Sequence, residues 1–375
     1  MRFPEFKGEW EKCKLEECVV FLDGKRKPIK SSERVSEQKL YPYYGASGII
    51  DYIDDYLFDG KFILLSEDGA NILDRNYRVA FIAEGKIWVN NHAHVLQSND
   101  NIDINFIAEK LESLDYSIYN TGTTMPKLNQ EVCRNIPLWL PPTEEQVKIG
   151  TLLSLLNERI TTQSKIIEKY ESLIKGINEK LLINKKEYTT YRLSDICEIR
   201  SGYSGTQLTG TQGLMVSRIE TISKHCINLD KVGYVKPFDS SADFKLHIGD
   251  ILFSNINSVQ YIGNTAFVDR EYDLYHGMNL LRLIPRKIVE LSSGFLLLNT
   301  AKYKIHFQSI CNKAISQASI NQTELGKTVI HIPDLLYQKQ ICQLYNSLYN
   351  KKNIENLYLQ ALKQQKNHLL RQMVI

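Results

Sequence analysis

The sequence lacks the features of an exported or membrane-spanning protein. Its seven cysteines are odd in number, scattered, and include no C-x-x-C pair, which favours free thiols in a reducing compartment over a disulfide framework or a zinc ribbon. The N-terminal stretch MRFPEFKGEW has no apolar signal segment, and no apolar run of about 18 residues occurs anywhere. We therefore expect a cytoplasmic protein that is neither exported nor anchored in a membrane.

The chain also lacks a strong charge of either sign. Lysine and arginine number 46 against 43 aspartates and glutamates, which leaves a net charge of +3 and neither favours nor excludes a nucleic-acid partner. Any basic surface must therefore be local. No G-x-G-x-x-G or Walker loop is present to hold the phosphates of a cofactor.

Internal repetition indicates how the chain is divided. At 375 residues, 43% of them hydrophobic, the chain exceeds the usual size of one domain. A repeat of this kind determines the domain architecture of a chain. The two copies align at a constant offset: Leu128-Asn129-Gln130 with Ile320-Asn321-Gln322, Leu140-Pro141 with Ile332-Pro333, Gln146 with Gln338, and Ile149 with Ile341.

Each copy is followed by apolar residues at alternating spacings of four and three, the period of a supercoiled helix. Pro141-Pro142 and Thr143 predict the start of the first helix. In the second copy Lys352, Glu355 and Lys366 interrupt the pattern. The positions predicted to line the two helices are Ile149, Leu153, Leu156, Ile160, Ile167, Ile174 and Leu181, and then Ile341, Leu348, Leu359, Leu362 and Leu369.

The segments before the helices are short runs of Val, Ile, Tyr and Phe broken by Gly, Asn and Asp, as at residues 61–65 and 250–254. Both read as mixed, β-rich globules. We therefore predict an α+β chain in which two β-rich domains, at residues 1–142 and 185–332, alternate with two long helices, at 143–184 and 333–375. We expect the helices to pair as an antiparallel coiled coil, with the joint between the halves at Asn184-Lys185-Lys186-Glu187.

An ordinary helical hairpin used for dimerisation would give the same helical pattern. Two helices of similar length that each leave a similar globule can instead pair antiparallel and hold the globules at opposite ends. About 33 residues at 1.5 Å each would span roughly 50 Å, which is more than one turn of DNA at about 34 Å.

Residues 85–96, GKIWVNNHAHVL, pose a question of chemistry. In one continuous strand, alternate side chains face opposite sides. The side expected to face the core carries Ile87, Val89, Ala93 and Val95, and the polar side carries Lys86, Trp88, Asn90, His92 and His94. Two histidines at i and i+2 can bind zinc, but no third or fourth ligand stands nearby. The remaining interpretations are a polar surface that contacts a ligand and a structural role in which Asn and His satisfy backbone groups.

Five stretches carry a family resemblance: RFPEFKGEW at 2–10, YYGASGI at 43–49, EDGAN at 67–71, WVNNHAHVL at 88–96 and PPTEEQ at 141–146. They closely resemble the DNA specificity subunits of Type I restriction-modification systems, and the resemblance extends over nearly the whole chain. The second half supports it with GDILFS at 249–254 and SQASIN at 316–321, and departs from it by having Ile332-Pro333-Asp334 in place of a double proline.

The resemblance implies two target-recognition domains that each read one half of a split DNA sequence. It also implies that this chain is no enzyme. Two modification subunits carrying S-adenosylmethionine would methylate adenine N6, and restriction subunits would supply a motor and a nuclease. Leu140-Pro141-Pro142-Thr143 is not a [DN]-P-P-[FY] adenine-methylation motif. The alternatives are a coiled-coil scaffold that binds proteins and a self-sufficient methyltransferase-like enzyme.

Candidate DNA contacts follow from side-chain chemistry. Asn can hydrogen-bond adenine through two atoms, and Lys or Arg can bind guanine or phosphate, whereas tyrosines can stack or belong to the core. The candidates in the first half are Tyr43, Tyr44, Ser47, Lys86, Asn90, Asn91, His92, Thr123, Thr124 and Lys127. Those in the second half are Arg218, Ser254, Asn255, Asn257, Gln317 and Ser319. No metal site and no cofactor site are predicted in this chain.

Overall fold

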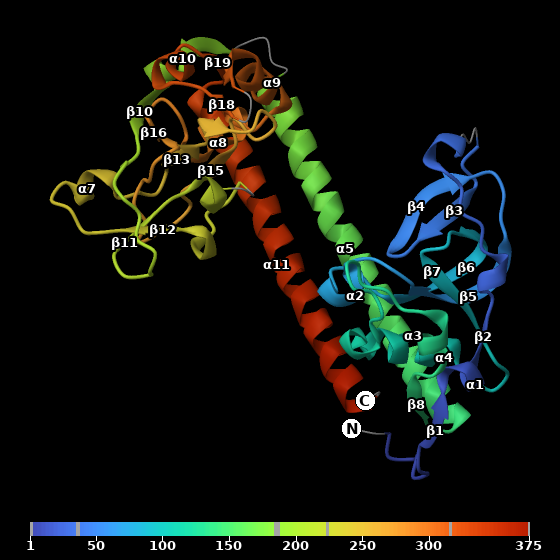
Figure 1. Ribbon diagram of the computed structural model, residues 1–375. Coiled ribbons are helices and arrows are strands. Elements are labelled where there is room, and N and C mark those ends of the chain that lie inside the picture. Colours follow the sequence, from blue (N-terminus) through green and yellow to red (C-terminus); the bar gives the residue numbers. More distant parts are fainter. Residues whose placement is uncertain (1–2, 35–37, 184–187, 223–224, 315–316, 374–375) are drawn as a thin grey trace. The chain divides into compact units, whose positions relative to one another are not determined.

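A computed structural model describes residues 3–34, 38–183, 188–222, 225–314 and 317–373, without the side chains of residues 178, 181–183 and 291–293. The predicted joint at residues 184–187 lies outside the described residues. The chain forms two compact units, residues 1–165 with 356–375 and residues 166–355. Each unit contains one β-rich globule and a part of both long helices, so the fold is α+β as predicted (Figure 1).

The globule of the first unit is built on a six-stranded sheet with strand order β2-β7-β5-β6-β3-β4. Strand β3 runs parallel to β6, and the other neighbours are antiparallel. A separate ribbon pairs β1 with β8. The strands are β1 (Glu11–Lys14), β2 (Val19–Phe21), β3 (Tyr41–Gly45), β4 (Gly48–Ile53), β5 (Phe58–Ser66), β6 (Ala80–Val89), β7 (Ala93–Ser98) and β8 (Pro137–Leu140). The helices are α1 (Leu15–Cys18), η1 (Asp23–Lys25), η2 (Ser31–Glu33), α2 (Asn71–Asp74), α3 (Ile104–Ser113), η3 (Tyr116–Tyr119) and α4 (Gln130–Arg134).

Helix α3 joins this sheet to the first long helix. The side chain of Asp103 caps it by accepting a hydrogen bond from the Phe106 amide at 2.7 Å, which satisfies one of the free donors of the first turn. Its apolar face buries Phe106 and Leu111 in the same cluster as Leu153 and Leu156. The core of the first globule is therefore continuous with the first long helix.

The globule of the second unit has smaller sheets. Its largest has strand order β10-β16-β13-β15, and the others are β14-β18-β17, β11-β12 and β19-β9. The strands are β9 (Thr189–Arg192), β10 (Cys197–Ser201), β11 (Leu214–Val216), β12 (Gly233–Val235), β13 (Ile251–Phe253), β14 (Ile256–Asn257), β15 (Thr265–Phe267), β16 (Leu281–Pro285), β17 (Asn312–Lys313), β18 (Ala318–Ser319) and β19 (Val329–Ile332). The helices are α6 (Leu193–Ile196), η4 (Ile219–Ile222), η5 (Leu229–Lys231), α7 (Ser241–Phe244), α8 (Leu291–Leu298), α9 (Ala301–Ile310) and α10 (Gln322–Gly326).

The two globules share a frame where they meet the long helices, which confirms the repeat seen in the sequence. Ribbon β1-β8 corresponds to β9-β19, and α1 corresponds to α6. The Leu15 amide donates to the Ile136 carbonyl at 3.0 Å, and the Leu193 amide donates to the Thr328 carbonyl at 2.9 Å. Two short helices, α4 and α10, are each capped by an asparagine, Asn129 or Asn321.

A glutamine fixes the same junction in both units. Gln146 Oε1 accepts from the Asp103 amide at 3.1 Å, and its Nε2 donates to the Pro141 carbonyl at 2.9 Å. Gln338 Oε1 accepts from the Glu290 amide at 2.9 Å, and its Nε2 donates to the Pro333 carbonyl at 2.8 Å. Both side chains are buried. Each glutamine therefore ties the start of a long helix to the start of another helix of its globule, α3 in the first and α8 in the second.

The first long helix is α5 (Thr143–Ile183), which begins at Thr143 as predicted. Along its predicted apolar seam Ile149, Leu153, Leu156 and Ile167 are buried, and Ile160 and Ile174 are half-buried. The side chain of Leu181 lies outside the described part of the chain.

The second long helix is α11 (Leu335–Met373), continuous through all three polar positions that interrupt its apolar pattern. Burial follows the same seam: Ile341 and Leu362 are buried, and Leu348, Leu359 and Leu369 are half-buried. The polar residues have partners. Lys366 Nζ lies 2.8 Å from Glu109 Oε2 on α3, and Lys352 Nζ lies 3.8 Å from Glu171 Oε1 on α5.

The pairs made by the two helices are antiparallel. In the first unit Leu153 and Leu156 share a core cluster with Leu370 and Met373. Further along α5, Arg159 donates to the hydroxyl of Tyr358 at 2.7 Å. In the second unit Glu171 faces Lys352. Residue numbers therefore fall along α11 as they rise along α5, as in an antiparallel coiled coil.

The helices and the cysteines bear on the expectation that the protein is neither exported nor anchored in a membrane. None of the helices within the described segments is long and apolar enough to cross a membrane. All seven cysteines lie in described segments, and none of them forms a disulfide bond.

Candidate nucleic-acid interface

The stretch at residues 85–96 is not one continuous strand, so the expected alternation of its side chains is wrong. Strand β6 ends at Val89 and β7 begins at Ala93, with Asn90, Asn91 and His92 forming the connection. Trp88 and His94, expected on a polar face, are 7% and 0% exposed. The segment is buried on both sides because it runs between separate core clusters: Trp88 packs with Tyr43, and Val89 and Val95 pack with Phe58.

His94 is the centre of a buried polar cluster in the first globule. Its Nδ1 lies 2.6 Å from Asp23 Oδ2 and its Nε2 lies 2.9 Å from the Leu128 carbonyl. Asp23 also accepts from the Val95 amide at 2.9 Å and from Gln130 Nε2 at 2.7 Å. Arg26 completes the cluster, donating to Glu67 at 2.6 Å and to the Ala93 carbonyl at 2.8 Å. The WVNNHAHVL segment is thereby joined to the loops on both sides of it.

The electrostatics of this cluster favour a charged imidazole. Burial alone lowers the pKa of His94, but the hydrogen bond to Asp23, the neighbouring Cys133 and the negative charge of Asp23 together outweigh burial and raise the pKa to about 10. Burial raises the pKa of Asp23, and its contacts with His94, Val95 and Arg26 bring the net pKa below its usual value. The pair is therefore an internal ion pair with its polar atoms engaged inside the protein.

A group of loops in the first globule, called the first loop group here, brings together six of the candidate residues. The His92 carbonyl accepts from the Glu67 amide at 2.9 Å, and the Pro126 carbonyl accepts from the Gly69 amide at 3.0 Å. Ser66 Oγ donates to the Ala46 carbonyl at 2.6 Å, which adds the turn between β3 and β4. The candidates in these loops are all exposed: Ser47, Asn91, His92, Thr123, Thr124 and Lys127.

Partners hold the polar side chains of the first loop group in place. His92 Nδ1 lies 2.8 Å from Asp68 Oδ1 while half of its side chain remains exposed. Lys127 Nζ lies 3.5 Å from Glu67. Asp68 lies in the EDGAN motif, yet the sequence alone did not single it out, because only the fold places it beside His92.

The other candidates of the first half lie apart or are internal. Asn90 is 5% exposed and its Oδ1 accepts from the His92 amide at 2.8 Å, which shapes the connection. Tyr43 is 2% exposed, and its hydroxyl accepts from the Ile29 amide at 3.0 Å. Tyr44 is half-buried near Phe81. Lys86 is exposed, with its Nζ 4.7 Å from the ring centroid of Tyr56.

In the second globule the structure gathers five candidates around β14 and β18. Ile256 pairs with Ser319 and Asn257 with Ala318. Ser254 is fully buried and accepts from Asn257 Nδ2 at 3.1 Å. Gln317 is exposed, and Ser319 is half-buried. Residue 316, part of the SQASIN stretch, lies outside the described residues.

Two candidates of the second globule have buried polar atoms without a hydrogen-bond partner among the described residues: Asn255 Oδ1 and Arg218 Nε. Asn255 Nδ2 makes only a long bond, 3.4 Å, to the Ile320 carbonyl. Arg218 Nη2 donates to Gln207 Oε1. Native proteins rarely leave such atoms unpaired, so each points to an ordered water or to a ligand. Gln207 was not foreseen, since nothing in the sequence relates it to Arg218.

The two histidines that suggested zinc bind different carboxylates, Asp23 and Asp68. Among the residues that the structure describes, no group of three or more His, Cys, Asp or Glu side chains is placed to hold a metal ion.

Comparison with known proteins identifies the family. The model of the Type I restriction modification DNA specificity domain matches residues 7–172 and again 185–364. A putative type I restriction enzyme specificity subunit from Haemophilus influenzae is 29% identical over 357 residues, which are 90% of this chain and 86% of that protein. A putative type I restriction enzyme specificity subunit from Methanocaldococcus jannaschii is 37% identical over 193 residues, 50% of this chain and 45% of that protein.

Solved structures share the fold. The crystal structure of a Type I restriction-modification system S subunit from M. genitalium has a TM-score of 0.67 at 14% identity, covering 100% of this chain and 97% of that chain. A structure from work on the assembly of the type I restriction-modification system has a TM-score of 0.55 at 15% identity and covers 98% of both chains. Since the family model matches both halves of the sequence, the chain belongs to the DNA specificity subunits of Type I restriction-modification systems and is itself non-catalytic.

Proposed function

We propose that the chain recognises a bipartite double-stranded DNA target, one half with each globule, and directs adenine-N6 methylation or restriction by partner subunits. The observation that carries this proposal is the repeated frame. Gln146 and Gln338 tie two differently built globules to two long helices by the same hydrogen bonds. Different sheets on one frame are what two independent DNA readers require.

The chemistry belongs to the partners in this proposal. Two modification subunits carry S-adenosylmethionine and transfer the methyl group, and restriction subunits supply the motor and the nuclease. The sequence contains no G-x-G-x-x-G or Walker motif to hold a cofactor phosphate. The complex works in the cytoplasm, in keeping with seven cysteines that are free thiols.

DNA contacts in the first globule come from the first loop group, whose exposed amide, hydroxyl and ammonium groups suit base edges and phosphates. In the second globule they come from Asn255, Asn257, Gln317 and Arg218. The unpaired Asn255 Oδ1 accepts hydrogen bonds and the unpaired Arg218 Nε donates one. A base edge or an ordered water at the DNA surface supplies the missing partners.

A domain exchange tests the proposal. Residues 1–140 are replaced with the corresponding segment of a related specificity subunit, the chimera is expressed with its modification subunits, and the methylated sites of the host genome are mapped. We expect one half of the target to change and the other to stay. A methylome altered in both halves, or in neither, would contradict separate reading. A coiled-coil protein scaffold predicts no sequence-dependent DNA binding, and a self-sufficient enzyme predicts methylation by the purified chain alone.

A further inference from the structure

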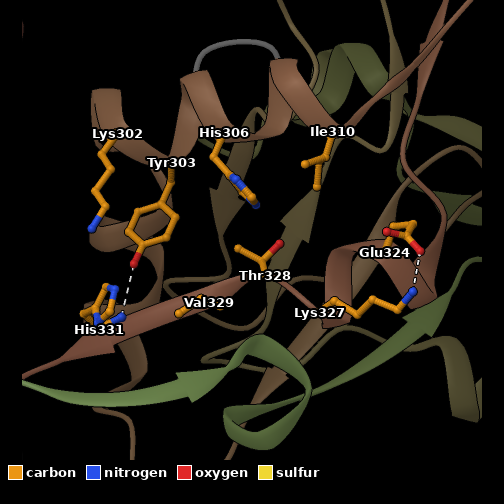
Figure 2. A pocket seen from close by; sticks show the side chains of 9 residues that line it. All are labelled: Lys302, Tyr303, His306, Ile310, Glu324, Lys327, Thr328, Val329 and His331. Carbon is orange, nitrogen blue, oxygen red and sulfur yellow. Dashed lines mark hydrogen bonds and ion pairs between the residues drawn. The ribbon is translucent and has the colours of Figure 1, made fainter.

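A pocket of about 300 Å³ lies in the second globule between α9, α10 and β19. Figure 2 shows Tyr303, His306 and Ile310 reaching from α9 toward Thr328, the residue that precedes β19, with Lys302 at one end and Lys327 at the other. None of the DNA-contact candidates lines this pocket.

Two polar atoms of the pocket have no hydrogen-bond partner among the described residues, Thr328 Oγ1 and His306 Nε2. Thr328 is only 3% exposed, so its hydroxyl is removed from bulk water without compensation, a condition that native proteins avoid unless something else binds there. The shared frame itself does not require a hydroxyl at this position. The equivalent position in the first globule is Ile136, which is apolar and fully buried.

The charges around the pocket leave one cation uncompensated. Lys327 Nζ is paired with Glu324 Oε1 at 2.7 Å. Tyr303 Oη accepts from the His331 amide at 3.1 Å, and His331 Nδ1 lies 3.0 Å from Thr190 Oγ1. Lys302 has no ion pair in the described part of the chain; its Nζ lies 5.5 Å from the ring centroid of Tyr303.

We propose that this pocket binds a phosphate group, with Lys302 supplying the charge and Thr328 and His306 the hydrogen bonds. The three donors come from two segments of the chain: Lys302 and His306 lie on α9, and Thr328 lies between α10 and β19. A phosphate group has oxygens in several directions and can accept from all three, whereas a carboxylate offers two oxygens in one plane. Burial lowers the pKa of His306, so a neutral imidazole can donate through Nε2 in one tautomer.

The phosphate can come from two sources, a DNA strand or free orthophosphate. The DNA source rests on the proposed function, because it requires that the second globule contact DNA. The free anion does not. The two are separated by measuring each in turn.

The first measurement is nuclear magnetic resonance of the full chain with ¹³C-labelled histidine, titrated with sodium phosphate at constant ionic strength. The His306 resonance is assigned by its loss in His306→Gln. We expect phosphate to shift this resonance. Thr328→Val and Lys302→Gln should weaken binding about tenfold, the size of a lost charge-assisted hydrogen bond. Matched controls are Thr323→Val and Lys287→Gln, exposed residues of the same globule that do not line the pocket.

The second measurement is the salt dependence of target-duplex binding by the complex with its modification subunits. The slope of log K against log salt is negative. If a DNA phosphate occupies the pocket, Lys302→Gln reduces the magnitude of this slope by about one, and Lys287→Gln leaves it unchanged. An unchanged slope with an intact phosphate shift assigns the pocket to free phosphate.

The proposal is overturned if phosphate leaves the His306 resonance unmoved and Lys302→Gln leaves the slope unmoved. It is also overturned if sodium acetate shifts the resonance and phosphate does not, which would indicate a carboxylate ligand. Lys302 is exposed, so its variant tests the pocket even if Thr328→Val fails to fold. If only the domain exchange fails to give the expected result, the proposed function is contradicted and the phosphate titration is unaffected.

Discussion

At the scale of single residues, the His94–Asp23 pair has the clearest energetic consequence. The raised pKa of His94 means that folding favours its charged form, whose ordinary pKa is 6.5. The stabilisation is therefore complete below about pH 6.5 and is lost as the pH rises toward 10. The lowered pKa of Asp23 acts in the acidic range. Its contribution to the stability of the fold is present above its ordinary pKa and is lost as the pH falls through the lowered pKa.

We expect His94→Gln to destabilise the first globule by about 3 kcal/mol at neutral pH, because it leaves Asp23 buried without its cation. The wild-type advantage should shrink between pH 7 and pH 10. Hydrogen exchange of peptides covering 93–98, corrected for the intrinsic rate at each pH, measures both effects.

His276→Gln is the matched control for His94→Gln. His276 is equally buried but lies 3.0 Å from the Leu280 carbonyl, and burial lowers its pKa to about 4. It is therefore neutral across the interval from pH 7 to pH 10, and its variant should show no change in destabilisation there. Equal pH profiles for the two variants would remove the ion-pair explanation.

Arg218 is expected to set one base of the half-site recognised by the second globule. Arg218→Ala should relax that position at a cost of about 1–3 kcal/mol in discrimination and leave the other half-site unchanged. Arg270→Ala is the control, since Arg270 is exposed and stacks on Tyr272 at 5.1 Å. Mapping methylated sites for both variants checks this. A uniform loss of methylation at all sites would instead assign Arg218 to folding or to phosphate binding.

At the scale of elements, the sequence predicted the helices better than the strands. The start of α5 followed from Pro141-Pro142 and Thr143, which are local signals, and the seam followed from spacing. The prediction of alternating side chains at 88–96 was wrong because alternation presumes a strand with one buried face. Here core clusters lie on both sides, and β6 and β7 are separate strands joined through Asn90, Asn91 and His92.

Part of the candidate interface could be predicted and part could not. Of the first loop group, Ser47, Asn91 and His92 come from quoted motifs, so the resemblance singled them out, whereas Thr123, Thr124 and Lys127 were chosen by side-chain chemistry. The partners Asp68 and Gln207, and the burial of Tyr43 and Ser254, depend on contacts between segments distant in sequence. A single sequence carries no signal for such contacts.

The polar positions of α11 select its partners. Glu109 is 3% exposed and lies against Arg78, Asn157 Nδ2 at 2.8 Å and Lys366 Nζ at 2.8 Å. Replacing Lys366 by leucine keeps the seam filled but removes one charged bond, at about 2 kcal/mol. We expect faster hydrogen exchange in residues 356–373, with no change for Lys363→Leu, an exposed position of the same helix. Unaltered exchange in Lys366→Leu would show that apolar packing alone holds this segment.

At the scale of the whole molecule, we expect the helix pair to set the gap between the two half-sites. Glu171 and Lys352 face one another, so deleting residues 165–171 together with 352–358 removes one heptad and both partners of an ion pair. The pair shortens by about 10 Å, close to three base pairs of DNA at about 3.4 Å each. The original target should be lost, and a shorter gap is the expected replacement.

Deleting only residues 165–171 is the control, because it mismatches the two seams and should abolish assembly. Mapping methylated sites for both deletions gives the result. If the matched deletion still methylates the original sequence with its original gap, the helices do not measure the distance.

The division into two units also has a consequence for synthesis on the ribosome. The second unit is continuous, from 166 to 355, whereas the first needs residues from 356 onward. Leu370 and Met373 belong to the core cluster of the first globule. The globule that is translated first therefore has an incomplete core until the second globule has been translated. Ribosome stalling before residue 356 should leave the later globule protected from protease and the earlier one sensitive.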